Sequence, residues 1–568
     1  MKILLRSYSL LAIIGCYLQQ VAAQPIPQTF SRQDTLRGTL TPERSWWDVV
    51  FYDLHVTPDF NKFSLTGSNT ILFRIVRPPA PVLQIDLQEP LVLDSAFLNN
   101  VSVAFKRDGN AWFLELPRRK MPPSLPQHQY GGKPLQELRL YYHGVPRPAL
   151  RAPWDGGLVW KKDAQGNPWL GTACQGFGAS SWWPCKDHQS DEPDSARISV
   201  TVPDTLMNIS NGRLREIKDG GNGMRTYTWH VSYPINNYNI TMNVGKYAHL
   251  SDTLMGENGK LDLDYYVLAY NLEKAKQQFQ QVKPMLRAFE YWMGPYPFYR
   301  DGYKLVETSY LGMEHQSAIA YGNQYQNGYM GTDLSRSGWG LKWDFIIVHE
   351  SGHEWFGNNI TTRDIADMWV HEGFTNYSEV LYTDYHFGTA AGDAYLQGLR
   401  RNIANDKPII GPYGVNKQGS NDMYYKGSNL VHMIRQIAGD SLFRLLLRDM
   451  HTRFGLKTTS SSEVEAFISQ RIGYDLSKTF DQYLRTTQIP VLEYYVTGSG
   501  NDMVLHYRWT NCLPGFNMPI LLPGTPEKYG LILANENWQQ LRVRFASADE
   551  LAARLNKNFY VTYKAVNQ

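Results

Sequence analysis

The spacing of apolar residues changes twice along the chain, and these changes restrict its fold more than any other feature. Over residues 46–250, apolar and polar residues alternate in short runs such as Tyr52-Asp53-Leu54-His55-Val56, and turn residues such as Pro58-Asp59 separate the runs. Alternation with a period of two is typical of half-buried strands in antiparallel sheets. We therefore expect an N-terminal antiparallel β domain over residues 46–250.

Beyond about Asn271 the apolar spacing lengthens to that of helices. Helices are expected at 273–293, 340–357, 366–386, 424–437 and 441–454, with a strand at 303–306. Alternation returns after Pro490. The sequence thus predicts a multidomain α+β chain, with a mainly helical domain at 251–488 and a small C-terminal β domain at 489–568.

The first residues have the pattern of a secretory signal peptide. Lys2 and Arg6 precede an apolar stretch at 10–14, and Val21-Ala22-Ala23 supplies the small residues of a cleavage site. We expect residues 1–23 to be removed on export, which in a bacterium would deliver the chain to the periplasm or the outside. In a second interpretation, residues 13–16 form a lipoprotein box and Cys16 becomes a lipid anchor. Residues 24–45 are expected to form a loose arm.

Charge and cysteine content exclude several classes of protein. The 568 residues carry a formal net charge of only +3, without a long run of one sign, so nucleic acid is not expected as a partner. No later segment is apolar for long enough to span a bilayer. Three cysteines beyond residue 23 are too few for a disulfide framework. Cys174 and Cys185 either pair with each other or are small buried thiols.

The strongest local signal is His349-Glu350-Ser351-Gly352-His353. Residues four apart on a helix face the same side, so both imidazoles can bind one metal ion. Catalytic zinc sites usually take a third protein ligand and leave one position open. Glu372, on the next predicted helix, completes a set of two histidines and one glutamate. We expect one zinc ion per chain, although cobalt or manganese can occupy similar sites.

Two further carboxylates belong to the chemistry of this site. Glu350 would face the open side of the metal, where a carboxylate can take a proton from water that the metal has acidified. Glu379 follows Glu372 by two helical turns, where it either orients a ligand histidine from behind or lies on a solvated helix face. The competing interpretation, in which His349 and His353 are merely packed on an apolar face, leaves Glu372 unexplained.

The residues around these positions resemble the aminopeptidase N family of gluzincin metallopeptidases, which includes leukotriene hydrolase. The resemblance is carried by His-Glu-Trp-Phe-Gly-Asn at 353–358, Trp-Val-His-Glu-Gly-Phe at 369–374, Tyr-Asp-Leu at 52–54 and the segment 184–193. It implies a thermolysin-like catalytic domain followed by a β-sandwich. Many members add a helical domain that covers the active site. Because only about 80 β-rich residues follow here, we expect an open cleft or one closed by another subunit.

The resemblance also assigns contacts to the substrate. Leu311-Gly312-Met313-Glu314-His315 lies where the family has its Gly-x-Met-Glu-Asn exopeptidase motif, with Leu311 in place of the first Gly and His315 in place of Asn. It implies that Glu314 binds the α-ammonium of the substrate. A fixed carboxylate beside the metal does favour a charged N-terminus over an internal peptide bond. The departures are expected to reshape the pocket for the first side chain, so selectivity does not carry over.

Two more positions match the family's motifs. Tyr424, in Tyr-Tyr-Lys-Gly at 424–427, matches a tyrosine that donates to the developing oxyanion, with Tyr425 as the one-residue alternative. Gln175, in Cys-Gln-Gly at 174–176, matches a glutamine that helps to bind the amino terminus; the alternative is a plain loop residue.

Together these residues predict a zinc aminopeptidase that removes the first residue from peptides with a free N-terminus. Glu350 would act as the general base and Tyr424 would stabilise the oxyanion. Glu314 and Gln175 would fix the N-terminus, so that cleavage is exo rather than endo. The alternatives are a thermolysin-like endopeptidase, epoxide hydrolysis as in one branch of the family, and an inactive peptide-binding protein that keeps the fold.

Overall fold

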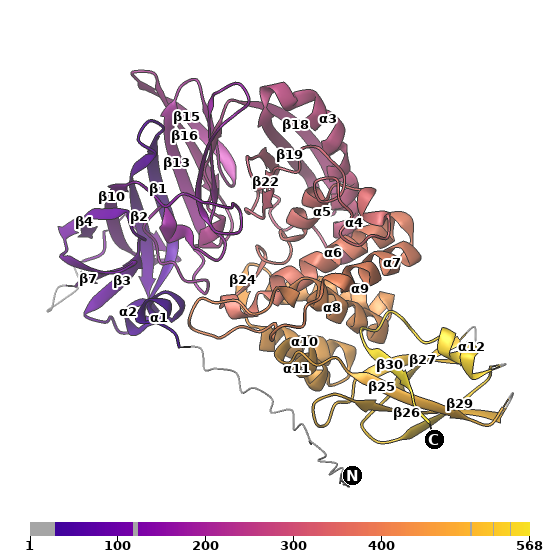
Figure 1. Ribbon diagram of the computed structural model, residues 1–568. Helices are drawn as coiled ribbons and strands as arrows, with labels where there is room; N and C mark the ends of the chain where they lie inside the picture. The colour runs from indigo at the N-terminus through magenta and orange to yellow at the C-terminus, as the bar shows by residue number, and fades with distance from the viewer. Residues whose placement is uncertain are drawn as a thin grey trace, which may run out of the picture.

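The computed structural model describes residues 29–116, 123–125, 127–499, 502–525, 528–545 and 547–567. The expected signal peptide at 1–23 and the alternative lipid anchor at Cys16 lie outside these residues. Figure 1 shows the described chain passing through three regions in order: a β-rich region in indigo to magenta, a helical region, and a small β-rich region in yellow. The expected multidomain α+β architecture is confirmed.

An eight-stranded sheet forms the larger part of the N-terminal domain, in the order β15-β16-β13-β1-β2-β10-β4-β5. Its strands are β1 (Trp47–Asp59), β2 (Ser64–Ile75), β4 (Val92–Leu98), β5 (Val101–Ser102), β10 (Gln136–Gly144), β13 (Ser195–Pro203), β15 (Arg213–Gly221) and β16 (Met224–Val231). In β1, Leu54 and Val56 are buried and His55 is exposed, so the alternation becomes an inner and an outer face. One pair departs from the antiparallel expectation: β1 and β13 run parallel, because a long connection rather than a hairpin joins them.

Smaller sheets complete this domain, in the orders β11-β12-β17-β14, β3-β7-β6 and β8-β9. Their strands are β3 (Val82–Asp86), β6 (Phe105–Asp108), β7 (Ala111–Glu115), β8 (Gln129–Tyr130), β9 (Lys133–Pro134), β11 (Gly157–Lys162), β12 (Pro168–Ala173), β14 (Met207–Ile209) and β17 (Asn243–Gly245). Cys174 and Cys185 are both buried and free. The structure therefore supports the interpretation of Cys174 and Cys185 as small buried thiols and not as a disulfide pair.

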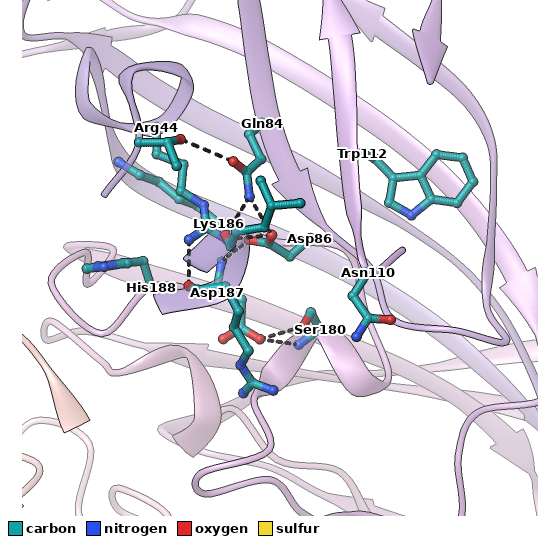
Figure 2. Close-up of polar contacts among 12 residues, drawn as sticks. Arg44, Gln84, Asp86, Asn110, Trp112, Ser180, Lys186, Asp187 and His188 are labelled. Carbon is teal, nitrogen blue, oxygen red and sulfur yellow. Dashed lines mark hydrogen bonds and ion pairs between the residues drawn. The ribbon is translucent and has the colours of Figure 1, made fainter. Parts of the chain in front are cut away.

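The expected loose arm at 24–45 is wrong for residues 32–45, which form helices α1 (Arg32–Gly38) and α2 (Pro42–Ser45). Ser31 and Asp34 make a capping box at the start of α1. Arg44 is completely buried and pairs with Asp86 of β3 at 2.5 Å. Figure 2 shows Arg44 within a cluster that includes Asp86. Polar composition predicted a loose segment, but buried polar contacts hold it in place. Residues 24–28 lie outside the described chain.

The helical region starts with a five-stranded sheet in the order β18-β19-β20-β22-β21. Its strands are β18 (Tyr247–Gly256), β19 (Gly259–Leu268), β20 (Tyr303–Glu307), β21 (Gly312–Met313) and β22 (Ile319–Tyr321). The expected domain boundary at 250/251 falls inside β18, because the alternating pattern continues through β18 and β19 into this second sheet. The short strand β21 lies at the edge and pairs antiparallel with β22.

Helices α3 and α4 lie between β19 and β20 in the chain, the other helices follow the sheet, and all of them pack around one core with it. They are α3 (Leu272–Gln278), α4 (Val282–Met293), α5 (Phe345–Gly352), α6 (Trp369–Phe387), α7 (Thr389–Leu399), α8 (Tyr425–Ala438), α9 (Asp440–Phe454), α10 (Ser461–Ile472) and α11 (Ser477–Arg485). Helix α5 is shorter than the expected 340–357, because Asp344 caps its N-terminus by accepting from the N–H groups of Ile346 and Ile347. Helices α7, α10 and α11 add to the expected set, and the strands β23 (Ile360–Thr362) and β24 (Lys457–Thr459) pair in parallel.

The C-terminal region is a small β domain. A four-stranded sheet, β29-β26-β25-β30, lies beside the β27–β28 hairpin. The elements are β25 (Val491–Thr497), β26 (Met503–Thr510), β27 (Pro519–Thr525), β28 (Lys528–Leu533), β29 (Gln539–Val543), α12 (Ala548–Ala553) and β30 (Thr562–Ala565). Phe480 and Leu484 of α11 share a core with Leu492 and Phe516, so the domain packs on the helices. Within the part of the chain that the structure describes, no helix has the length and apolar character needed to cross a bilayer.

Candidate metal centre

Two adjacent helices bring the three expected ligands together. His349 lies in the last turn of α5, His353 is the residue at which that helix ends, and Glu372 lies in the first turn of α6. Gly352 allows the helices to approach closely, since a Cβ there would stand 2.4 Å from Ser378 Oγ of α6. The local sequence thus sets both the ligand spacing and the helix contact.

The ligand atoms converge on one point. His353 Nε2 lies 3.3 Å and His349 Nε2 3.8 Å from Glu372 Oε2, and all three residues are buried. Ligand atoms held about 2.0–2.1 Å from a tetrahedral zinc ion lie about 3.3 Å from one another. Glu372 Oε2 has no hydrogen-bond partner among the described residues, although it is buried. A buried carboxylate oxygen left without a partner fits a metal ligand.

Each histidine is oriented through its other ring nitrogen. His349 Nδ1 donates to Glu379 Oε1 at 2.7 Å, and His353 Nδ1 donates to the carbonyl of Phe356 at 3.0 Å. Such contacts leave Nε2 free to bind a metal and hold the ring in place. Glu379 is completely buried, so a solvated helix face is not its environment.

Charges also favour a cation in this position. Burial lowers the pKa of His353, but the carboxylates of Glu372 and Glu314 outweigh burial and raise that pKa to about 10. Burial raises the pKa of Glu372, and the two histidines more than reverse this effect. Without a metal, the cluster therefore draws a proton onto a histidine. The residue types, the geometry and the charge all fit a bound zinc ion.

Glu350 belongs to a second cluster that shares His353 with the metal ligands. Glu350, Glu314 and His353 form a second group whose oxygen and nitrogen atoms lie within 4.8 Å of one another. Glu350 also faces β21, since a Cβ on Gly312 would stand 2.8 Å from Glu350 Oε1. Burial raises the pKa of Glu350 to about 7. A carboxyl group with a pKa near neutrality can both accept and return a proton.

Glu314 is fixed by three donors. Gln175 Nε2 donates to Glu314 Oε1 at 2.5 Å, and Tyr238 OH donates to the same oxygen at 3.0 Å. Asn358 Nδ2 donates to the backbone carbonyl of Glu314 at 2.7 Å. The structure thus brings Glu314 and Gln175 together beside the metal ligands. Tyr238 is absent from the expected site because no motif surrounds it, and it is one of 36 tyrosines.

Tyr424, rather than Tyr425, lies beside the metal ligands. Its ring stacks on that of His349 with centroids 6.2 Å apart, and burial together with the carboxylate of Glu372 raises the pKa of its phenol. The residues after it have structural roles. Lys426 Nζ donates to the carbonyl of Thr486 at 3.0 Å.

The glycine that follows, Gly427, permits a close contact between helices α8 and α6. A Cβ on Gly427 would stand 3.1 Å from Gly373 Cα of α6. Lys426 and Gly427 therefore hold the first turn of α8 in place, and the position of this turn sets the position of the Tyr424 ring.

Met313 and His315, the sequence neighbours of Glu314, are also expected to contact the substrate, but their surroundings support that role less well. Met313 of β21 is buried in a small cluster with Val159 and Tyr310. His315 is completely buried, and neither of its ring nitrogens has a hydrogen-bond partner within the described chain. Burial lowers the pKa of His315 to about 3, so the ring is neutral. A substrate contact for either residue stays a prediction.

Known proteins with similar sequences include aminopeptidases and leukotriene A-4 hydrolase. Residues 270–483 match the model of the peptidase family M1 domain. The chain is 23% identical over 436 residues to probable aminopeptidase 1 of Sulfurisphaera tokodaii, a match that covers 73% of this chain and 52% of that protein. It is 24% identical to leukotriene A-4 hydrolase of Xenopus laevis, with 75% and 68% covered. The chain spans about half the length of the archaeal relatives that it matches.

Solved structures share the fold. An M1 zinc metallopeptidase from Deinococcus radiodurans matches with a TM-score of 0.64 and 22% identity, covering 78% of this chain and 94% of that one. Aminopeptidase A of Legionella pneumophila matches with a TM-score of 0.71 and 14% identity, covering 92% and 60%. The family match falls on the helices that hold His349, His353 and Glu372. The catalytic region, residues 270–483, is therefore a peptidase family M1 domain, the family to which the similar zinc metallopeptidase of Deinococcus radiodurans belongs.

Proposed function

We propose that this chain is a zinc-dependent aminopeptidase that removes the N-terminal residue from peptides. The observation that carries the proposal is the place of Glu314, a buried carboxylate in one cluster with Glu350 and His353. Its side-chain partners, Gln175 and Tyr238, are neutral donors. A carboxylate whose hydrogen-bond donors are neutral can bind the α-ammonium of a peptide as a charged partner.

His349, His353 and Glu372 would hold the zinc ion. When bound, zinc acts as a Lewis acid that polarises the first peptide carbonyl and makes water more acidic. Glu350 accepts the proton of the attacking water and returns it to the leaving amine, a task suited to its near-neutral pKa. Tyr424 donates a hydrogen bond to the oxyanion as its charge develops. Because Glu314 fixes the ammonium at a set distance from the ligands, only the first peptide bond reaches the reactive position.

The test compares free and blocked N-termini. A panel of aminoacyl chromogenic amides and their N-acetylated counterparts is assayed with the zinc-loaded wild type and with Glu350→Gln. We expect hydrolysis of the free-amine substrates only, and a fall in kcat of at least about 10²-fold in the variant. Equal cleavage of acetylated substrates would establish the endopeptidase alternative. A zinc-loaded wild type that cleaves nothing but binds peptides would indicate an inactive binding protein.

We also propose that the chain is exported. The support is the charged, apolar and small-residue pattern at 1–23, which is typical of a signal peptide. N-terminal sequencing after expression with the intact leader tests this proposal. A new N-terminus at Gln24 is expected, lipid-modified Cys16 would favour the lipoprotein interpretation, and a retained Met1 would contradict both.

A further inference from the structure

Gln175 lies in a tight turn that contains two glycines with left-handed backbone. Gly176 has φ = 69° and Gly178 has φ = 98°, and the N–H of Gly178 donates to the carbonyl of Cys174 at 2.6 Å. From this turn, the Gln175 amide reaches Glu314 Oε1 at 2.5 Å. The direction of the amide therefore depends on whatever holds the turn.

Two side chains hold the carbonyl of Gly176, the residue next to Gln175. A guanidinium nitrogen of Arg37, in α1, donates to it at 3.0 Å, and Asn416 Nδ2 donates to it from a loop of the catalytic region, also at 3.0 Å. Arg37 also packs against the turn, since a Cβ on Gly178 would stand 2.4 Å from the same guanidinium nitrogen that donates to Gly176. Segments that are remote in sequence thus converge on one peptide group.

Helix α1 is itself fixed at its C-terminal end by side chains of α2 and of the N-terminal β domain. The contacts are Gln84 Nε2 to Leu36 O (3.0 Å), Arg44 NH1 to Arg37 O (2.7 Å) and His188 Nε2 to Gly38 O (3.2 Å). These donors satisfy carbonyls that a helix end leaves without intrahelical partners. Figure 2 shows Arg44, Gln84 and His188 in the cluster that also contains Asp86 and Asp187. The backbone that carries Arg37 is therefore held in place.

The same helix offers a matched control. Arg32, five residues before Arg37, donates to Asp108 of β6 at 2.8 Å and is itself exposed. Its charge, length and helix are those of Arg37, but its recorded partner lies away from the turn.

We propose that Arg37 is a positioning residue: by holding the carbonyl of Gly176, it aims Gln175 at Glu314 and at the α-ammonium of the substrate. The proposal rests on the aminopeptidase function proposed above. Asn416 acts on the same carbonyl from the catalytic region. Residues 32–38 then contribute to recognition of the substrate amine indirectly, through the turn that carries Gln175.

Kinetics of single and double variants test whether Arg37 affects catalysis through Gln175. Arg37→Gln is expected to lower kcat/KM for free-amine substrates about tenfold, mainly by raising KM, since a hydrogen bond to the charged amine weakens. Asn416→Asp, which removes the donor and keeps the shape, should act in the same direction, whereas Arg32→Gln should stay within about twofold of wild type. In a Gln175→Ala background, Arg37→Gln should cost at most about twofold, because both changes act through one contact. An undiminished tenfold loss there would overturn the proposal.

A pair of inhibitors separates this proposal from the proposed function. One is the hydroxamate of the preferred amino acid, and the other is the matching hydroxamate without the amino group. Arg37→Gln should weaken binding of the amine-bearing compound about tenfold and leave the other within about twofold. Equal binding of both compounds by wild type would refute amine recognition itself. A preference that is the same in wild type and variant would refute the role of Arg37.

Hydrogen–deuterium exchange over residues 174–178 gives a readout that does not need activity. Exchange should be faster in Arg37→Gln than in wild type and Arg32→Gln, with unchanged exchange in the core helices. If the turn exchanges equally in all three proteins, Arg37 does not hold it.

Discussion

Replacing Glu379 with glutamine would show how strongly the zinc affinity depends on the group behind His349. Glu379 Oε1 accepts from His349 Nδ1 at 2.7 Å and from Asn376 Nδ2 at 2.8 Å, and Oε2 accepts from Tyr395 OH at 2.7 Å. Glutamine has the same shape, so its oxygen can keep the first two contacts while its amide donates to the tyrosine. The main change is the loss of one buried negative charge.

The expected size follows from that single change. A hydrogen bond to a charged group is worth about 1.5–3 kcal/mol and a neutral one about 0.5–1.5 kcal/mol. The difference of about 1–2 kcal/mol corresponds to a zinc Kd about 5–30 times weaker. Loss of such outer contacts typically weakens metal affinity about 10–100-fold. We therefore expect a weakening of about tenfold for Glu379→Gln.

Competition with a chromophoric zinc chelator at fixed pH measures the Kd directly. Glu290→Gln is the matched control, because Glu290 is also buried and hydrogen-bonded, to Tyr299 OH at 2.6 Å, but lies on α4 away from the ligands. The control should lose stability without losing zinc affinity. A Glu379→Gln Kd within twofold of wild type, or an equal loss in Glu290→Gln, would refute the reasoning.

Three further changes test the hydrogen bond to the oxyanion, the strand β21 and the metal. Tyr424→Phe should lower kcat about 10²–10³-fold with little change in KM, whereas Tyr425→Phe should stay within about threefold in the same assay. Gly312→Ala should lower kcat about tenfold and spare zinc binding, because its methyl group would stand 2.8 Å from Glu350 Oε1 and 2.9 Å from Ile346; full activity would contradict this. Removing zinc should lower the thermal midpoint by several degrees, reversibly on re-addition, since a ligand at 1,000 times its Kd stabilises by about 4 kcal/mol.

The metal ligands could be predicted from local spacing in the sequence. The residues that hydrogen-bond to the site could not, because those contacts depend on tertiary packing. The four-residue interval between His349 and His353 works on any helix, so the sequence alone predicts a shared face. Tyr238 contacts Glu314 across 76 residues of sequence, and Tyr395 reaches Glu379 from the next helix. Neither contact follows from a local pattern, because each depends on how separate elements pack.

The fold likewise combines features that local sequence patterns predict with features that depend on tertiary packing. Alternating and helical periods predicted the order of the regions, since each period reports which face of an element is buried. The segment 32–45 was expected to be loose because it has few apolar residues. Its order comes instead from buried polar contacts such as Arg44 with Asp86 and Gln84 with the carbonyl of Leu36. Composition does not reveal contacts of this kind.

A lysine at position 175 tests why the partners of Glu314 are neutral. The hydrogen-bond donors to this buried carboxylate, Gln175 and Tyr238, are neutral, and burial raises the pKa of Glu314, which reflects the cost of its charged form. A substrate ammonium offsets part of that cost. Gln175→Lys would supply the ammonium permanently, so we expect a higher thermal midpoint together with a loss of activity on free-amine substrates of at least about 10²-fold. Gln175→Met, of similar length and uncharged, should lose activity without gaining stability. If the lysine variant is active, or no more stable than the methionine variant, Glu314 is not a site held open for an ammonium ion.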